Sequence, residues 1–207
     1  MINPETRGIG TLVEFARTAV TSSDNAVKVR DAFPQARIGK KMNLAFAQEL
    51  AQRPVNNFEF TDELILRPAI NPAKMGGSLY LNDSISLEHV RRQGSHELNA
   101  RLQNIARWNR IAADKGFEGL DEKGWFFTGF WKCGDDIRDR LVRENGLIIS
   151  SAGGFVHQVC RVIAWIENIA YENRKVFLVE PLSVEESKEF EIRVAKPGQQ
   201  TPDVFNG

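Results

Sequence analysis

Residues 125–131, WFFTGFW, decide the fold of this chain. Five of these seven residues are aromatic, and they fall on both faces of an extended segment. A strand with one solvated face alternates apolar and polar residues, so an unbroken aromatic run is typical of a central strand that is buried on both sides. The segment therefore predicts a strand at the heart of a sheet, with helices covering its rings.

A helix and a second strand are predicted directly after this aromatic strand. Asp135 and Asp136 begin the helix, where the positive end of the helix dipole favours carboxylates. Two acid-to-base pairs at i,i+4 spacing are expected on its surface, Asp136–Arg140 and Asp139–Arg143. Asn145-Gly146 ends the helix, and LIISS, residues 147–151, predicts a short buried strand.

The remainder of the chain predicts a helix, a hairpin and a tail. Gly153-Gly154 is interpreted as the start of a helix that runs to about Glu172, because the apolar residues after it form a wide stripe at helical spacing. KVFLVEP (175–181) and EFEIRVAK (189–196) predict a hairpin whose second strand directs its apolar residues inward. The polar tail, 198–207, is expected to be a loop.

The chain upstream of the aromatic strand predicts mostly helices and short strands. The predicted helices are Gly10–Val20, Lys40–Gln52 and His96–Lys115, and the predicted strand segments are 57–68 and 78–83. Pro54 stops the second helix, and Gly116 closes the third as the residue after its C-cap.

These elements predict an α+β protein with a mixed sheet of about five or six strands, packed helices and a helical N-terminal segment. Short links between helices and strands favour this class, although the order of the strands cannot be read from the sequence. Three regions are expected: a helical N-terminal segment (1–55), an α+β core (56–197) and a polar C-terminal tail (198–207).

Composition narrows the class of protein. Lysine and arginine total 27, and aspartate and glutamate also total 27, so the net charge is zero. A nucleic-acid site would therefore have to be a local basic patch. Two cysteines are too few for a disulfide framework, and polar residues interrupt the longest apolar-rich stretch, Phe155–Ala170. We expect a cytoplasmic protein without a membrane span.

The string KGWFFTGFW, residues 123–131, resembles the RNA-binding strand of RNA-recognition-motif domains. In that family a basic residue, a glycine and spaced aromatic residues line one strand, and the rings stack on unpaired bases. The chain lacks the second small residue of the motif, and a long helix separates this strand from LYLND (79–83). With the basic stripe upstream, the resemblance implies a nucleic-acid-binding set: Arg91, Arg92, Arg107, Arg110, Lys123, Trp125 and Phe127.

The same residues also have a structural interpretation. Aromatic residues fill the cores of many sheets, and most arginine stripes are the solvated faces of helices. Both interpretations stay open at this point.

The loop Ser150–Gly154 is a second candidate site. If a helix began at Gly153, its free backbone N–H groups could receive an anion, and the predicted anion-binding residues are Ser151, Gly153 and Gly154. The glycine spacing of nucleotide-binding loops is absent, so no nucleotide or other cofactor is predicted. The alternative is that the glycines permit a tight turn.

No residue pattern predicts a catalytic or metal site. The three histidines, His89, His96 and His157, are not clustered with one another or with the cysteines. Cys133 is interpreted as a packed thiol, and Asp135, Asp136 and Asp139 are explained by helix capping and ion pairs.

Three functions remain as hypotheses. The first is a non-catalytic binding or assembly subunit of a larger bacterial, phage or mobile-element complex, in which some of the four tryptophans and thirteen phenylalanines contact other protein subunits. The second is a module that binds RNA or single-stranded DNA. The third is an enzyme with an anion site at the Ser150–Gly154 loop.

Overall fold

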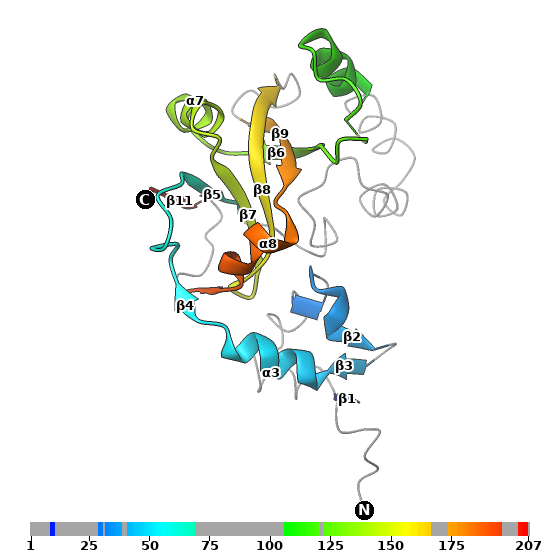
Figure 1. Ribbon diagram of the computed structural model, residues 1–207, viewed down its shortest axis with the longest axis vertical. Helices are drawn as coiled ribbons and strands as arrows, with labels where there is room; N and C mark the ends of the chain where they lie inside the picture. The colour runs from blue at the N-terminus through cyan, green and yellow to red at the C-terminus, as the bar shows by residue number, and fades with distance from the viewer. Residues whose placement is uncertain are drawn as a thin grey trace, which may run out of the picture.

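The computed structural model describes residues 9–10, 29–30, 32–38, 41–68, 106–120, 122–166, 174–195 and 203–206. Within this part the chain has the predicted α+β class, with a mixed sheet of eight strands. The sheet occupies the middle of the molecule, between a small lobe formed by residues 29–53 and a helix at 106–114 (Figure 1). The predicted helix Gly10–Val20, the predicted strand 78–83 and the first part of the helix His96–Lys115 lie outside the described residues.

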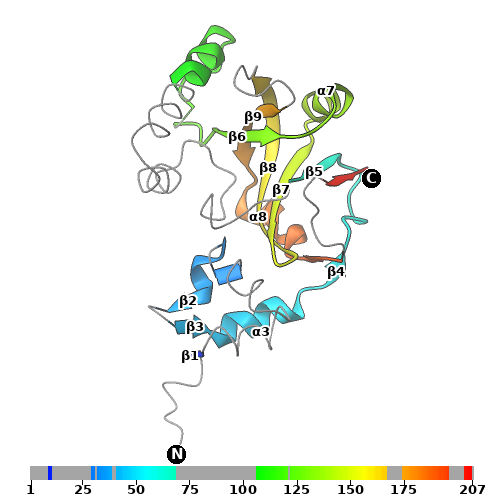
Figure 2. The same cartoon turned by 180° about the vertical axis from the view of Figure 1, so that it is seen from behind.

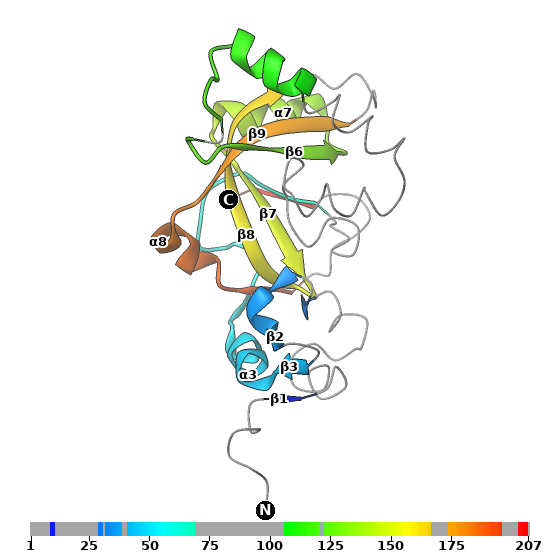
Figure 3. The ribbon, with the colours of Figure 1, turned by 90° about the vertical axis from the view of Figure 1, so that its right-hand side faces the viewer.

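β8, Phe155–Ile166, is the central strand of the sheet. β7 (Leu147–Ala152) pairs antiparallel with its first half, and β9 (Lys175–Pro181) pairs antiparallel with its second half on the other side. β6, Phe126–Trp131, continues the sheet beyond β9. Figure 3 shows β8 bending between these two groups of strands.

Four short strands complete the sheet. β5 (Ile65–Arg67) runs parallel to β7 and is paired on its other side with β11 (Asp203–Phe205). β10 (Arg193–Val194) pairs with the start of β8 and lies parallel to β4 (Val55–Asn56). The sheet is therefore wider than the predicted five or six strands, because strands of two or three residues leave almost no periodic signal in a sequence.

The helix predicted from Gly153 to Glu172 is wrong, because Phe155–Ile166 is strand β8. Gly153 and Gly154 have φ angles of 59° and 91°, and Ala152 pairs with Phe155, so the two glycines form a tight hairpin turn. Two β-bulges then interrupt the alternation of β8, one at His157 and one at Ile163. These bulges place apolar residues at irregular intervals, and the resulting pattern imitates a helical stripe.

α7, Asp135–Arg143, begins and ends as predicted. Asn145 takes the left-handed conformation (φ 50°), and the N–H of Gly146 donates to the carbonyl of Leu141. Among the described residues, neither expected pair, Asp136–Arg140 or Asp139–Arg143, forms a salt bridge, although the charges of each pair still attract one another. In the described part of the chain, Arg138 pairs with Asp135 and Asp139, and Arg140 pairs with Glu144.

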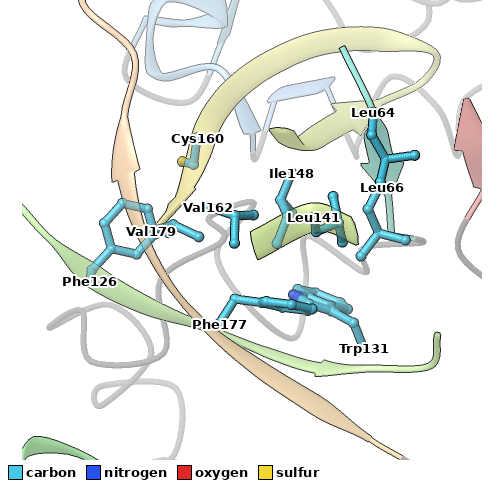
Figure 4. Packing of buried hydrophobic residues seen from close by; sticks show 10 residues of the cluster. All are labelled: Leu64, Leu66, Phe126, Trp131, Leu141, Ile148, Cys160, Val162, Phe177 and Val179. Atoms are coloured by element: carbon cyan, nitrogen blue, oxygen red, sulfur yellow. The ribbon is translucent and has the colours of Figure 1, made fainter. Parts of the chain in front are cut away.

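The aromatic strand β6 is buried on both faces, as predicted. On one face, Phe126 and Trp131 belong to an apolar cluster that also contains Leu141 of α7 (Figure 4). On the other face Phe127 lies under the helix 106–114, with its ring 5.8 Å from that of Trp108. The predicted central position is not seen within the described residues, where β6 pairs with β9 alone.

The predicted terminal hairpin is wrong, although its buried residues are confirmed. After β9 the chain forms α8 (Val184–Ser187) and a 3-10 turn, η4 (Lys188–Phe190), and β10 then joins β8. Phe190, Ile192 and Val194 are buried, as their alternation indicates. The tail is not wholly a loop, since residues 203–205 form β11.

The described N-terminal lobe contains more strand than predicted. A three-stranded sheet, β1 (Ile9–Gly10), β2 (Arg37–Ile38) and β3 (Lys41–Asn43), accompanies the turn η3 (Pro34–Ala36) and α3 (Leu44–Gln52). α3 is shorter than the predicted Lys40–Gln52 because the Asn43 side chain caps it, accepting from the N–H of Phe46. Among the described residues, no helix is both long enough and apolar enough to cross a membrane.

Candidate functional site

A cleft of about 530 Å³ lies between the N-terminal lobe and the sheet. Figure 2 shows the lobe below the β7–β8 turn, joined to the sheet through β4. The walls of the cleft come from three regions: the lobe (32–53), the first part of β8 (156–159) and the segment 181–191. Six of its lining residues carry the argument below: Phe33, Phe46, Glu49, Arg53, His157 and Glu191.

His157 reaches the cleft because of the bulge in β8. Ser150 pairs with Gln158 and Ser151 pairs with Val156, so His157 is an extra residue in the strand. Bulges of this kind re-aim a side chain and are frequent next to functional sites. The His157 Nε2 atom lies 2.6 Å from the Ser150 hydroxyl, and its ring meets the ring of Phe33 edge-on at 5.5 Å. His157 therefore connects the sheet to the lobe.

The Ser150–His157 pair has the partners of a nucleophile and its base, but its surroundings do not suit catalysis. Ser150 is completely buried, so a substrate in the cleft has no access to its hydroxyl. Burial lowers the pKa of His157 to about 4, which makes the ring neutral and weakly basic at pH 7. The pair is a neutral cross-strand hydrogen bond that fixes the histidine ring at the wall of the cleft.

Arg53 forms the second connection between lobe and sheet. It follows α3, and its Nη1 atom donates to the backbone carbonyl of Val156 over 2.9 Å. The guanidinium also lies over the ring of Phe33, 5.6 Å from the ring centroid. Burial lowers the pKa of Arg53, and the charges of Glu191 and Glu49 oppose that effect. Both carboxylates are therefore close enough to interact with the arginine.

The lining combines apolar surface with directional polar groups. Phe33 and Phe190 are buried beneath the surface of the cleft, and Phe46 is half-buried. Glu49 and Glu191 are exposed. Ligand sites typically join aromatic walls with a few polar groups that fix orientation, so this arrangement suits binding.

The predicted nucleic-acid residues are only partly brought together. Lys123 and Trp125 lie side by side, with the lysine Nζ 4.7 Å from the indole centroid, and the indole N–H donates to Glu180 over 3.1 Å. Phe127, by contrast, is 0 % exposed. A base could not stack on Phe127 in this structure, because the helix 106–114 covers it.

The predicted arginines have different outcomes. Arg107 and Arg110 are exposed on the helix 106–114, while Trp108 and Ala112 face the core. Gly116 closes this helix in the left-handed conformation (φ 86°), as predicted. Arg91 and Arg92 lie outside the described residues.

The predicted anion site has lost its structural basis. Ser151 belongs to β7, and Gly153 and Gly154 form the hairpin turn, so no helix begins there to offer free N–H groups. Anion binding at this turn stays a prediction that the local geometry does not support.

The cysteines and the acidic residues of α7 have surroundings that explain them as parts of the fold. Burial raises the pKa of the Cys133 thiol to about 11, and it raises that of Cys160 further. Asp135 pairs with Arg138 and Lys175. Within the described part of the chain, no group of three or more metal-ligating side chains is found. His89 and His96 lie outside that part.

Sequence reasoning missed the cleft and its polar residues. One signal could have revealed part of it, because Gly-Gly between two apolar runs is a hairpin signature. Recognising that hairpin would have placed Ser150 and His157 on adjacent strands. The positions of Glu49, Arg53 and Glu191 depend on long-range packing, for which the sequence gives no local signal.

Comparison with family models, with curated proteins and with solved structures finds no match to this chain.

Proposed function

We propose that the chain is a non-catalytic binding and assembly subunit, and that the cleft between lobe and sheet receives a segment of a partner protein. The observation that carries this proposal is the cleft itself, which is open, partly aromatic and lined by charged groups. The histidine on its wall is held by a serine that a substrate cannot reach.

The charges around the cleft favour a partner segment with a basic side chain. Glu49 and Glu191 carry two negative charges at the lining, whereas Arg53 carries one positive charge and already donates to Val156. His157 adds no charge at pH 7, because its pKa is lowered to about 4. The excess of negative charge attracts a cation, and the neighbouring phenylalanines can contact its aliphatic stem.

A pair of matched variants tests this proposal. Gln35→Trp places a large ring at the lining of the cleft, whereas Gln52→Trp places the same ring on α3 outside the lining. Proteins that co-purify with the tagged chain from its native host are quantified by mass spectrometry for both variants and for the unmodified chain. We expect one partner to be lost with Gln35→Trp and retained with Gln52→Trp. Equal recovery with both variants, or a chain that purifies alone, would contradict the proposal.

A nucleic-acid-binding function is the second candidate, and a different surface supports it. Trp165 is flanked by two cations, Arg138 at 4.3 Å and Lys115 at 5.6 Å from its ring centroid. Lys115 directly follows the helix that carries Arg107 and Arg110. Aromatic rings among basic side chains are typical of surfaces that bind single strands.

Filter binding with single-stranded RNA and DNA over a salt series tests the second candidate. We expect the affinity to fall as salt rises and to fall again in an Arg107→Ala/Arg110→Ala double variant. Arg143→Ala, at an exposed arginine of α7, serves as the control. Binding that ignores salt, or that both sets of variants reduce equally, would exclude this surface.

A further inference from the structure

β11 is an edge strand of the described sheet, and a small set of contacts made by its own residues holds it in place. β11 pairs antiparallel with β5, and the register places Asp203 opposite Arg67, Val204 opposite Leu66 and Phe205 opposite Ile65. β5 is engaged on its other side by β7. The edge of β5 is thus a slot for one added strand of three residues.

Specific side-chain contacts accompany this short ladder. Arg67 is 1 % exposed and forms an ion pair with Asp203, whose side chain is 11 % exposed. The ring of Phe205 lies 4.9 Å from that of Phe58, and the Arg67 guanidinium lies 5.7 Å from the centre of the Phe205 ring. Asn206 accepts from Arg140 of α7 over 2.9 Å. We call this set of partners, Phe58, Arg67 and Arg140 with the edge of β5, the strand socket.

A buried arginine makes the strand socket selective. Removing a guanidinium from water is costly, and a carboxylate within hydrogen-bonding distance offsets that cost. A strand that brings aspartate opposite Arg67 and an aromatic ring two residues later matches both parts of the socket. A strand that lacks this carboxylate would not form the ion pair that Asp203 makes with Arg67.

The contacts that hold β11 are made by residues 203–206 themselves. The same segment of a second copy therefore offers the socket an identical ladder, ion pair and ring. Docking within one chain and docking between two chains then differ mainly in effective concentration. Exchange of an identical element between copies is a low-cost route to a dimer.

We propose that the strand socket accepts residues 203–206 of a second copy of this chain, so that two copies join by exchanging β11. This interaction uses a surface on β5 and α7, whereas the proposed partner segment binds in the cleft. The two proposals are independent, and either can fail without the other.

Charge reversal tests the exchange. One variant carries Arg67→Glu and the other carries Asp203→Lys, so that each chain alone opposes like charges in its socket. Mixing the two restores opposite charges in both sockets, but only between chains. We expect light scattering to show twice the chain mass in the mixture and single-chain mass for each variant alone. A third chain with both substitutions restores the ion pair within one molecule, and light scattering should give it the same mass as the unmodified chain. A mixture that stays at single-chain mass would overturn the proposal.

A peptide measurement keeps the test decisive if Arg67→Glu fails to fold. The Asp203→Lys chain retains Arg67 and the rest of the socket, so a labelled peptide of residues 201–206, TPDVFN, should bind to it in trans. Replacing the aspartate of the peptide by asparagine should weaken binding by roughly tenfold to a hundredfold, as expected for loss of a charge-assisted hydrogen bond. Failure of the native peptide to bind, or equal binding of both peptides, would also overturn the proposal.

Discussion

The two sides of β8 are built in different ways. Under α7 the strand joins an apolar cluster of ten residues drawn from several elements, in which shape and buried area provide the cohesion. At the cleft the same strand meets the lobe through directional contacts, from Arg53 to Val156 and from His157 to Ser150 and Phe33. The buried side chains of the first region hold the fold together, whereas the second region borders an open cleft and depends on a few polar groups.

The largest effect is expected in the apolar cluster. Phe177 is fully buried and belongs to β9, the strand between β6 and β8. Phe177→Ala should reduce the free energy of unfolding by about 3–5 kcal/mol through lost contacts and a cavity. Urea denaturation measures the change, with Phe177→Leu as a milder control. A loss below about 1 kcal/mol would mean that this cluster does not dominate the stability of the fold.

Acidification should weaken the cleft region next. In the folded chain the pKa of His157 is lowered to about 4, whereas an unfolded histidine has a pKa of about 6.5. Between these values the unfolded state binds the proton and the folded state does not, so stability should fall as pH decreases from 7 to 4. The shift corresponds to roughly 2–3 kcal/mol. Urea unfolding of the unmodified chain and of His157→Gln over this pH range isolates the contribution of His157 to stability. Parallel pH profiles for the two chains would contradict the prediction.

Removing the Arg53 side chain should destabilise the lobe and leave the apolar cluster under α7 unaffected. Arg53→Met keeps much of the side-chain volume but deletes the hydrogen bond to Val156, and the expected loss of stability is about 1–2 kcal/mol. Hydrogen exchange should become faster in the lobe, at residues 44–52, and stay unchanged in β6. Uniform acceleration across both segments would show that lobe and sheet unfold as one unit.

The smallest effect is expected on the surface of α7. Glu144 pairs with Arg140 and Arg143, and all three side chains are exposed. Solvent and salt screen such pairs, so Glu144→Gln should leave the urea midpoint unchanged within error. A clear shift would indicate that exposed charges, and not burial alone, distinguish the α7 side of β8.

The same contrast explains which parts of the structure could be predicted. β6 and α7 carry local signals, an aromatic run and a helix that ends with Asn145 in the left-handed conformation, and both elements are confirmed. β8 was predicted as a helix because bulges at His157 and Ile163 disturb its period of two. A bulge depends on the partner strand, so a single segment does not reveal it.

The candidate site was less predictable than the fold. The cleft joins Phe33, Arg53, His157 and Glu191, which lie far apart in the sequence and meet through packing of the lobe on β8. β4 and β11 contain two and three residues, and each is defined by its partner and not by its own pattern. Of the predicted nucleic-acid residues, Phe127 is buried because a helix covers that face of β6.

The turn at Gly153-Gly154 also has a consequence for how quickly different parts of the sheet can assemble. Closing a loop of two glycines sacrifices little chain entropy, and β7 and β8 meet across it in register. We therefore expect this hairpin to form early, on the microsecond timescale of isolated hairpins. The contact between Arg67 and Asp203 spans 136 of the 207 residues, so it forms only after most of the chain has collapsed. During synthesis on the ribosome, β7 and β8 would therefore pair before β11 does. The edge of β5 would stay unpaired until residues 203–206 emerge.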